Sequence, residues 1–256
     1  MASQNEIRLN PRYLMSSTNS TESRYMGSEL ELFAYAKNWK AYWTSKIAPL
    51  LGNSILEVGA GVGSNFSLLW NEQHSWTAVE PDPAQCTKIS EIFDAIDTSN
   101  SLKIVTGTLQ DVPEQENFDS IIYIDVLEHI EDDALELSNA YKHLNQGGLV
   151  VVLSPAHQSL FSPFDKSVGH FRRYNKKTLK KLLPIGANIK QLYYLDSVGC
   201  IASWCNSKIL KSGMPTRGQI WVWDSLMIPL ARVLDRILSY KLGKTIVAVY
   251  EKPVTE

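Results

Sequence analysis

Short runs of apolar residues recur along the chain, separated by stretches in which apolar residues are spaced as on one face of a helix. The runs are SILEVG, TAVE, LKIVTG, FDSIIYID, LVVVLS, IKQLYYL and TIVAVYE. The near-continuous apolar character of FDSIIYID is typical of a strand in a parallel sheet that is covered on both faces. Each of the seven runs is therefore predicted to form a strand.

Helices are predicted between the strands. They cover residues 29–51, 64–70, 84–93, 132–144 and 176–183. The first has apolar side chains near a 3.6-residue period, among them Tyr35, Trp39 and Trp43. Strands that alternate with helices predict an α/β fold with a doubly wound, seven-stranded and mostly parallel sheet.

Two long segments interrupt this alternation, at residues 155–175 and 197–243. We predict an N-terminal arm and lid helix over residues 1–50, and a main domain over residues 51–256 that carries both segments as insertions. The second insertion holds a helical apolar stripe made of Trp223, Leu226, Met227, Leu230, Val233, Leu234 and Ile237. We expect the stripe to pack on the sheet, with a lid over an apolar pocket or a peripheral membrane contact as alternatives, and we expect Pro229 to kink its helix.

Composition narrows the class of protein. The chain has 256 residues, of which 44% are hydrophobic and 20% charged, as in ordinary globular proteins. Its first thirty residues lack the apolar core of a signal peptide, and no apolar run approaches the roughly 20 residues that span a bilayer. Three cysteines without a CxxC motif do not form a disulfide framework. We therefore expect a cytoplasmic protein.

The net charge of −2 conceals an uneven distribution. Residues 1–156 carry 9 Lys and Arg against 21 Asp and Glu, whereas residues 157–256 carry 16 against 6. Such a division is compatible with two surfaces that face different partners, and equally with two solvated faces.

The turn after the first strand carries the clearest chemistry. It reads Glu57-Val58-Gly59-Ala60-Gly61-Val62-Gly63. Glycines at this place let the backbone approach a ligand beyond the carboxyl ends of the strands. The spacing is E-x-G-x-G-x-G, and Ser64 stands where the dinucleotide pattern G-x-G-x-x-G requires a third glycine.

Two further features accompany this turn. Glu80 closes the second strand, where a carboxylate can accept hydrogen bonds from both hydroxyls of a ribose. The segment DVLEHI, which begins at Asp125, follows the fourth strand. Together, LEVGAGVG and DVLEHI resemble the class I S-adenosylmethionine (SAM)-dependent methyltransferases of the type 11 or 12 small-molecule group. The resemblance runs from about residue 54 to residue 153 and implies their Rossmann-like fold and SAM as cofactor.

The resemblance also implies roles for individual residues. Backbone near Gly59 and Gly61 would hold the methionine end of SAM, and Glu80 its ribose. Thr108 and Leu109 would flank the adenine, with Asp111 as an alternative to Thr108, and Asp125 would line the pocket. The cofactor-binding set expected on this basis is Glu57, Gly59, Ala60, Gly61, Gly63, Glu80, Pro81, Thr108, Leu109, Asp125 and Val126. Alternatively, Glu57 satisfies backbone donors near the turn, and His129 packs or orients a helix.

The loop after the fifth strand is predicted to bind the acceptor. Its GHFRRYN stretch contains Arg172 and Arg173, whose planar guanidinium groups suit a carboxylate or phosphate. His157 and His170 are candidate general bases. Alternatively, an arginine pins the loop to the acidic half, for example through Asp165. The loop is also similar to an S-P-A-H…D…G-H-x-R-R-Y pattern in bacterial methyltransferases of glycan, lipid-linked or secondary-metabolite pathways.

The expected acceptor-binding set is Tyr35, Trp39, Arg172, Arg173 and Tyr174. No metal site is expected, because His157, His170 and Asp165 match no ligand spacing. We predict methyl transfer to a small molecule with an apolar body and an anionic group. The alternatives are a nucleic-acid methyltransferase, although no N/D-P-P-Y-type motif follows the fourth strand and nucleic acid is not the expected partner; a NAD-dependent oxidoreductase; and a non-catalytic SAM-binding subunit. The oligomeric state stays open.

Overall fold

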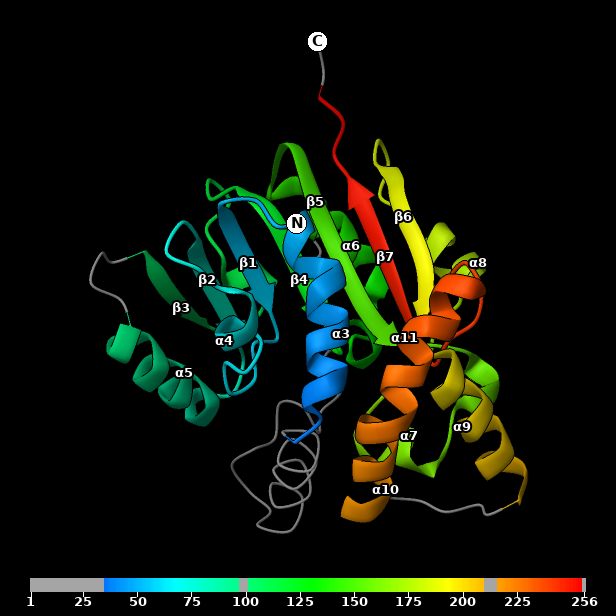
Figure 1. The fold of residues 1–256 in the computed structure, drawn as a ribbon. Coiled ribbons are helices and arrows are strands. Elements are labelled where there is room, and N and C mark those ends of the chain that lie inside the picture. The colour runs from blue at the N-terminus through cyan, green and yellow to red at the C-terminus, as the bar shows by residue number, and fades with distance from the viewer. Residues whose placement is uncertain (1–34, 97–100, 210–215, 255–256) are drawn as a thin grey trace.

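All seven predicted strands form, and they join in one mixed sheet (Figure 1). The computed structural model describes residues 35–96, 101–209 and 216–254. The strands are β1 (Ser54–Val58), β2 (Ser75–Glu80), β3 (Leu102–Thr106), β4 (Phe118–Ile124), β5 (Leu144–Pro155), β6 (Asn188–Leu195) and β7 (Thr245–Glu251). Their order is β3-β2-β1-β4-β5-β7-β6. The first five strands are parallel, and β7 runs antiparallel to both of its neighbours.

Helices cover both faces of the sheet. One face carries α3 (Lys37–Ile47), α4 (Phe66–Leu69), α5 (Pro83–Ile96) and α11 (Ile228–Ile237), and the other carries α6 (Asp133–Lys142) and α8 (Lys176–Lys181). Because both faces are covered, β4 and the middle of β5 are buried almost throughout. This is the doubly wound arrangement predicted from the alternation of strands and helices.

The remaining helices are short or lie beyond the carboxyl ends of the central strands. They are α7 (Pro163–Ser167), α9 (Ser197–Ile209), α10 (Arg217–Val222), the π-helix η5 (Trp223–Met227) and the 3₁₀-helices η1 (Ala48–Leu50), η2 (Leu109–Asp111), η3 (Leu127–His129) and η4 (Gln158–Leu160). Of the first predicted helix, residues 29–34 lie outside the described ranges. Within those ranges, no helix is long and apolar enough to cross a bilayer.

The insertion at residues 197–243 folds differently from the expectation. Four residues of its apolar stripe are exposed, namely Leu226 (61%), Leu230 (52%), Val233 (57%) and Ile237 (71%). The prediction that the stripe packs on the sheet is wrong for these four residues. Pro229, which was predicted to kink its helix, stands in the first turn of α11, directly after the π-helix.

Two aspartates on the opposite side explain this orientation. Asp224 is buried and accepts hydrogen bonds from the backbone N–H groups of Asn38 (3.1 Å) and Trp39 (2.8 Å), in the first turn of α3. Asp235 is fully buried and accepts from Tyr42 Oη (2.8 Å) and from the Ser197 N–H (2.9 Å) that opens α9. Unpaired N–H groups at helix N-termini need acceptors, and a carboxylate also suits the positive end of the helix dipole. Because these two aspartates cap helices inside the protein, the side of the segment that carries them faces inward.

Candidate active site

The glycine-rich turn after β1 adopts the conformation that its sequence predicts. Gly59, Gly61 and Gly63 all have positive φ, at 71°, 58° and 76°. A Cβ atom at Gly59 would lie 2.6 Å from Val126 Cγ2, so only glycine fits there. A Cβ at Gly61 would meet nothing nearer than Gln85 Oε1 at 3.5 Å. The turn therefore packs closely against β4 on one side and leaves its backbone open on the other.

Glu80 ties this turn to the end of β2. Its Oε2 accepts the Gly61 N–H (2.8 Å), and its Oε1 accepts the Asp82 N–H (3.0 Å). The residue is 1% exposed. Desolvation raises the pKa of Glu80 to about 7, although the two backbone hydrogen bonds act in the opposite direction.

Glu57 lies beneath the turn. It is buried and accepts hydrogen bonds from Asn65 Nδ2 (2.9 Å) and Trp76 Nε1 (3.2 Å), and desolvation raises its pKa to about 7. These contacts correspond to the alternative in which Glu57 satisfies donors around the turn, although the donors are side chains. Ala60, at 3% exposure, is likewise packed into the core.

A cavity opens where the carboxyl ends of β1 to β4 meet. It is lined by Val58, Gly59, Val79, Pro81, Gly107, Thr108, Leu109, Val126, His129, Ile130 and Glu136. The predicted residues Gly59, Pro81, Thr108, Leu109 and Val126 are among them. Glu136 was not predicted to line the cavity, because a glutamate in the first turn of a helix is usually a solvated charge. It is buried, accepts a hydrogen bond from Tyr123 Oη (2.8 Å), and has its pKa raised to about 7 by desolvation.

The turn after β3 contains both residues that were predicted as alternatives for contact with the adenine, Thr108 and Asp111, and their surroundings differ. Asp111 accepts hydrogen bonds from the Thr108 N–H (2.8 Å) and from Thr108 Oγ1 (3.1 Å), which forms a capping box for η2. Thr108 and Leu109 line the cavity, whereas the Asp111 carboxylate is engaged in the cap. Asp125, with a φ of 54°, is an exposed residue at the end of the otherwise buried strand β4.

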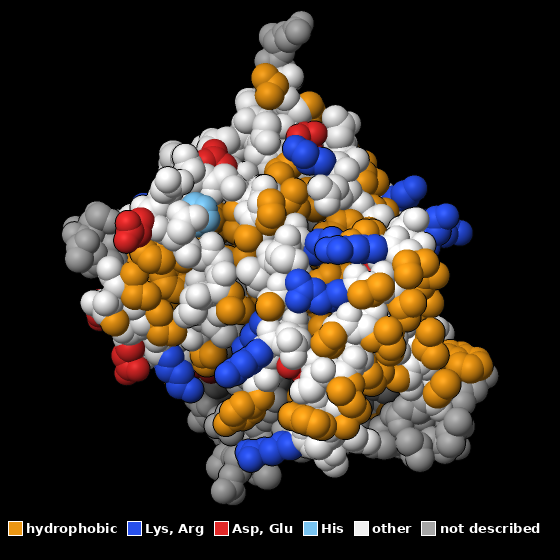
Figure 2. Space-filling view, viewed as in Figure 1, with side chains coloured by type: hydrophobic (Ala, Val, Ile, Leu, Met, Phe, Trp, Pro, Cys, Tyr) orange, Lys and Arg blue, Asp and Glu red, His pale blue; other side chains and the backbone are white. Residues whose placement is uncertain are grey.

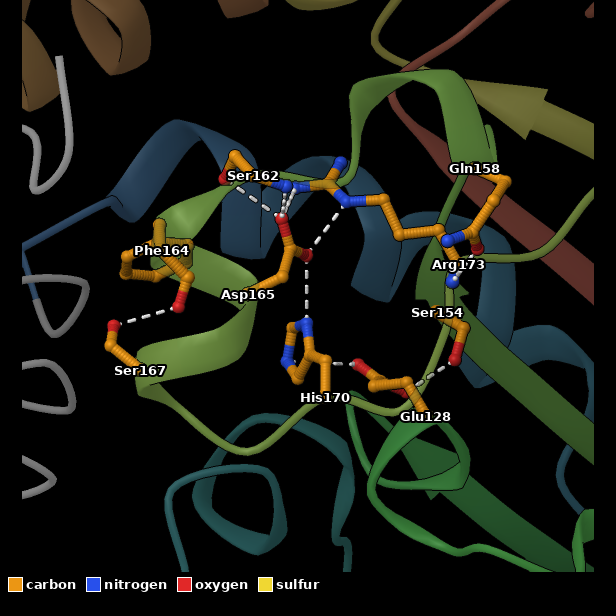
Figure 3. A network of polar contacts seen from close by, with 9 residues as sticks. All are labelled: Glu128, Ser154, Gln158, Ser162, Phe164, Asp165, Ser167, His170 and Arg173. Carbon is orange, nitrogen blue, oxygen red and sulfur yellow. Dashed lines mark hydrogen bonds and ion pairs between the residues drawn. The ribbon is translucent and has the colours of Figure 1, made fainter. Parts of the chain in front are cut away.

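The loop after β5 is organised around one buried carboxylate (Figure 3). Asp165 receives two hydrogen bonds from Arg173, from Nε (2.7 Å) and Nη2 (3.0 Å), and a third from His170 Nδ1 (2.9 Å). Burial acts to raise the pKa of Asp165, but the bonds from His170 and Arg173 outweigh it and hold that pKa well below its usual range. Arg173 is 8% exposed. The pairing of an arginine with Asp165 is the alternative that the sequence left open.

Arg172 and Tyr174 converge on a second carboxylate, Asp133 at the start of α6. Arg172 Nη1 lies 2.6 Å from Asp133 Oδ2, and its Nη2 donates to the Glu131 carbonyl (2.7 Å). Tyr174 Oη donates to the same Asp133 oxygen (2.8 Å) and lies 3.1 Å from the Leu127 carbonyl oxygen. Tyr174 is fully buried, so it is not part of the acceptor site proposed below.

The other predicted acceptor residues lie in different surroundings. His157 has a φ of 64°, and its ring stacks on Tyr194 of β6 with centroids 4.8 Å apart. Trp39 packs against Trp223 of η5, with ring centroids 5.8 Å apart, so α3 and the second insertion do meet. Tyr35 is 69% exposed.

Lys244 is a basic residue at this edge of the sheet that belongs to no recognised sequence motif. Lys244 directly precedes β7, and Thr245 beside it pairs with Pro155 at the carboxyl end of β5. Its side chain is half-buried, and Nζ lies 5.6 Å from the centre of the Trp223 ring. Burial lowers the pKa of Lys244, while the neighbouring Asp196 acts to raise it. Ion pairs between described residues include none to this ammonium group.

The cofactor half of this edge fits SAM. The open backbone at Gly61, the buried carboxylate of Glu80 and the cavity beyond Thr108 follow one another along adjacent strands, and they would hold the amino acid, the ribose and the adenine of SAM. When bound, SAM supplies a methyl group on a sulfonium ion. The task left to the chain is to hold a nucleophile in line with that methyl group and to exclude water.

Comparison with known proteins agrees with this geometry. Residues 34–185 match the family model of the methyltransferase domain. The chain therefore belongs to this family, and the site is that of a class I SAM-dependent methyltransferase. The NAD-dependent oxidoreductase considered from the glycine-rich turn alone is accordingly excluded. No curated protein matches the sequence.

Solved structures share the fold at low sequence identity. A SAM-dependent methyltransferase from Thermotoga maritima superposes with a TM-score of 0.59 at 16% identity, over 90% of this chain and 96% of its own. The phosphoethanolamine N-methyltransferase 2 of Haemonchus contortus, in complex with SAM, gives 0.62 at 12% identity over 97% of this chain and 61% of its own. The [4+2]-cyclase SpnF gives 0.59 at 13% identity, over 90% and 95%.

Proposed function

We propose that the protein transfers the methyl group of SAM, in the cytoplasm, to a small molecule with an apolar body and an anionic group, such as a secondary metabolite or a lipid-linked or glycan precursor. In this proposal α3 and the segments 155–175 and 197–243 enclose the acceptor beside the cofactor cavity. Lys244 takes the role that the sequence suggested for Arg172 and Arg173, because both arginines are already paired with carboxylates.

The position of Lys244 is the observation that carries the proposal. A half-buried ammonium group that forms no ion pair in the described ranges, and has Asp196 only as a neighbouring charge, is stabilised when an anion completes it. It lies close enough to Asp125, at the end of β4, for the two charges to interact. The aromatic rings of Trp223 and Trp39 beside it supply an apolar wall. An acceptor with both kinds of surface would match this edge of the sheet.

A protein with the same fold binds an anionic small molecule. The Haemonchus contortus enzyme has also been crystallised with phosphomonomethylethanolamine and S-adenosylhomocysteine. That molecule carries a phosphate, so a protein of this fold can bind an anionic small molecule together with S-adenosylhomocysteine. The precedent supports an anionic group on the acceptor, and the apolar body is inferred from the tryptophans of the present chain.

The test uses purified protein, methyl-labelled SAM and an extract of the source cells, with the products divided between organic and aqueous phases. We expect label in a small molecule and, once that acceptor is isolated, a KM at least tenfold higher for Lys244→Met. The matched control is Lys241→Met, which removes an exposed lysine from the same segment. Label in RNA or DNA would establish the nucleic-acid alternative. SAM binding without any labelled product would indicate a non-catalytic subunit, and an unchanged KM would remove Lys244 from the acceptor site.

A further inference from the structure

Three metal-binding side chains converge between the end of β4 and the loop after β5. Glu128, His129 and His170 each place a ligand atom within 4.8 Å of the ligand atoms of the other two. The first two come from η3 and the third from the segment that follows α7. Two imidazoles and one carboxylate form a donor set typical of divalent transition-metal ions.

The carboxylate and one imidazole face each other without a hydrogen bond. Glu128 is fully buried, and its Oε2 accepts a hydrogen bond from Ser154 Oγ. Among the residues described, its Oε1 has no hydrogen-bond partner, and it lies 3.9 Å from His170 Nε2. That separation is too long for a hydrogen bond but suits two ligands that share one ion. A cation bound between the two groups would also complete this unpartnered buried oxygen atom.

Asp165 holds His170 in the required state. In the tautomer whose Nδ1 donates to Asp165, the lone pair of the His170 ring lies on Nε2, toward Glu128. A histidine that binds a metal usually donates its other ring N–H to a carboxylate in this way. The bidentate contact from Arg173 fixes that carboxylate in turn. The GHFRRY segment therefore has a specific use for both its histidine and its second arginine.

His129 connects this cluster to the cofactor cavity. Its ring stands edge-on to His170, with centroids 4.6 Å apart, and it is one of the residues that line the cavity. Its ligand atom lies within 4.8 Å of those of Glu128 and His170, so the three side chains can reach one ion from the edge of the cavity. An ion bound here would be reached through the cavity and would stand beside the place of methyl transfer.

We propose that Glu128, His129 and His170 bind a divalent transition-metal ion, with Asp165 as the orienting partner of His170. The ion would coordinate an oxygen atom of the acceptor, a role that rests on the proposed methyl transfer, whereas metal binding itself does not. This proposal departs from the sequence-based expectation of no metal, which considered His157, His170 and Asp165. Here Asp165 acts behind the ligand instead of on the ion.

The test measures metal binding without SAM or acceptor. Protein stripped with a chelator is titrated with Zn²⁺, Mn²⁺, Co²⁺ and Mg²⁺ by calorimetry, and the visible spectrum of the Co²⁺ form reports the ligand geometry. We expect one transition-metal ion per chain, Zn²⁺ tighter than Mn²⁺, and at least tenfold weaker binding in His170→Gln and Glu128→Gln. His143→Gln is the control, because that buried histidine is bonded to the Glu116 carbonyl, away from the cluster.

Three outcomes would overturn the proposal. The first is that the wild-type protein does not bind one equivalent of any of these ions, a result that stands even if a variant fails to fold. Another is binding that survives unchanged in both variants. The third is equal loss in His143→Gln, which would indicate an adventitious ion only. Because SAM affinity is measured separately, a missing metal leaves the methyltransferase assignment intact.

The second insertion, residues 197–243, carries an exposed apolar surface. The exposed apolar side chains of α11 and η5 continue onto α10 and α9, where Trp221 (63%), Ile201 (54%) and Trp204 (54%) are also exposed. Figure 2 shows apolar and basic side chains gathered on this face. A contiguous apolar surface of this kind marks a contact with a partner or a membrane.

The charge on this surface favours a membrane over a protein partner. Both acidic residues of the segment 216–244, Asp224 and Asp235, are buried, and α3 and α9 contain no acidic residue. The charged side chains that α10, α11 and the turn after them present to solvent are therefore basic, as with Arg217, Arg236 and Lys241. Helices with an exposed apolar face and a basic border lie in the interface of anionic bilayers.

We infer that the surface formed by α9, α10, η5 and α11 docks on an anionic lipid bilayer. Full-length protein is sedimented with vesicles of phosphatidylcholine alone or with one quarter phosphatidylglycerol. We expect binding to the anionic vesicles, reduced at least fivefold by Leu230→Ser with Val233→Ser, but not by Ile185→Ser, a fully exposed apolar residue elsewhere. Absence of binding, or a wild-type dimer in light scattering that this double variant dissociates, would overturn the inference.

Discussion

The two halves of the site are held in place by different means. On the cofactor half, parallel strands end side by side, and glycine turns bring the backbone to the cavity. On the acceptor half, buried aspartates join segments that are far apart in the chain. Asp224 contacts Asn38 across 186 residues, whereas Glu80 contacts Gly61 across only 19. The first half thus depends on local backbone geometry and the second on long-range polar contacts.

This difference has a consequence for stability. A glycine turn on adjacent strands can change its ligand contacts while the sheet stays intact. A buried aspartate that caps a distant helix cannot be lost without leaving N–H groups unpaired inside the protein. We therefore expect substitutions in the cofactor half to affect binding first, and substitutions of the buried aspartates to affect folding first.

The largest effect is expected for Asp235→Ala. This change leaves Tyr42 Oη and the N–H groups of Asp196 and Ser197 without their acceptor. Unsatisfied buried donors of this kind predict a loss of about 3 kcal/mol in the free energy of unfolding, measured by urea denaturation. Val233→Ser, on the exposed side of the same helix, should change it by less than about 0.5 kcal/mol. Similar losses in the two variants would show that α11 is not oriented with Asp235 inward.

The sequence predicted the strands and the glycine-rich turn of the cofactor half because the signals for them are local. Seven apolar runs became seven strands, and E-x-G-x-G-x-G marked a turn whose glycines have positive φ. Five of the predicted cofactor residues line the cavity. Glu57 and Asp111 show the limit, since each carboxylate is engaged by donors of the protein itself, which residue type alone does not reveal.

The acceptor half could not be predicted in the same way. Helical periodicity identified an apolar stripe on α11 but not the side that faces inward, because hydrophobicity favoured one side and the caps for α3 and α9 favoured the other. Arg173 and Lys244 illustrate the same difficulty. The arginine in a suggestive motif proved to be paired, and the lysine without a motif proved to have no ion-pair partner among the described residues.

A smaller effect, on binding, is expected for Gly59→Ala. The new methyl group would lie 2.6 Å from Val126 Cγ2 and must displace the turn that holds SAM. We expect the Kd for SAM, measured by calorimetry, to rise about 30-fold, or about 2 kcal/mol. Gly147→Ala is the control, since Gly147 also has positive φ, yet a Cβ there approaches nothing closer than 3.5 Å. Equal effects on SAM affinity would mean that backbone strain, and not the close approach to Val126, is responsible.

The smallest effect is the pH dependence of SAM affinity. Glu80 has its pKa raised to about 7 in the free protein, so much of it is protonated at pH 6. Binding of a ribose and a sulfonium ion favours the ionised carboxylate and lowers its pKa, and a group whose pKa falls on binding releases its proton. The affinity should therefore increase about tenfold from pH 6 to pH 8 and level off above.

Two variants assign this titration. Glu80→Gln should bind SAM more weakly and with little dependence on pH, because the titrating group is gone. Glu57→Gln should keep the dependence, although the pKa of Glu57 is also raised to about 7, because its carboxylate contacts Asn65 and Trp76 beneath the turn. A wild-type affinity that is flat between pH 6 and pH 8, or a dependence that persists in Glu80→Gln, would show that Glu80 does not hold the ribose as an ionised carboxylate.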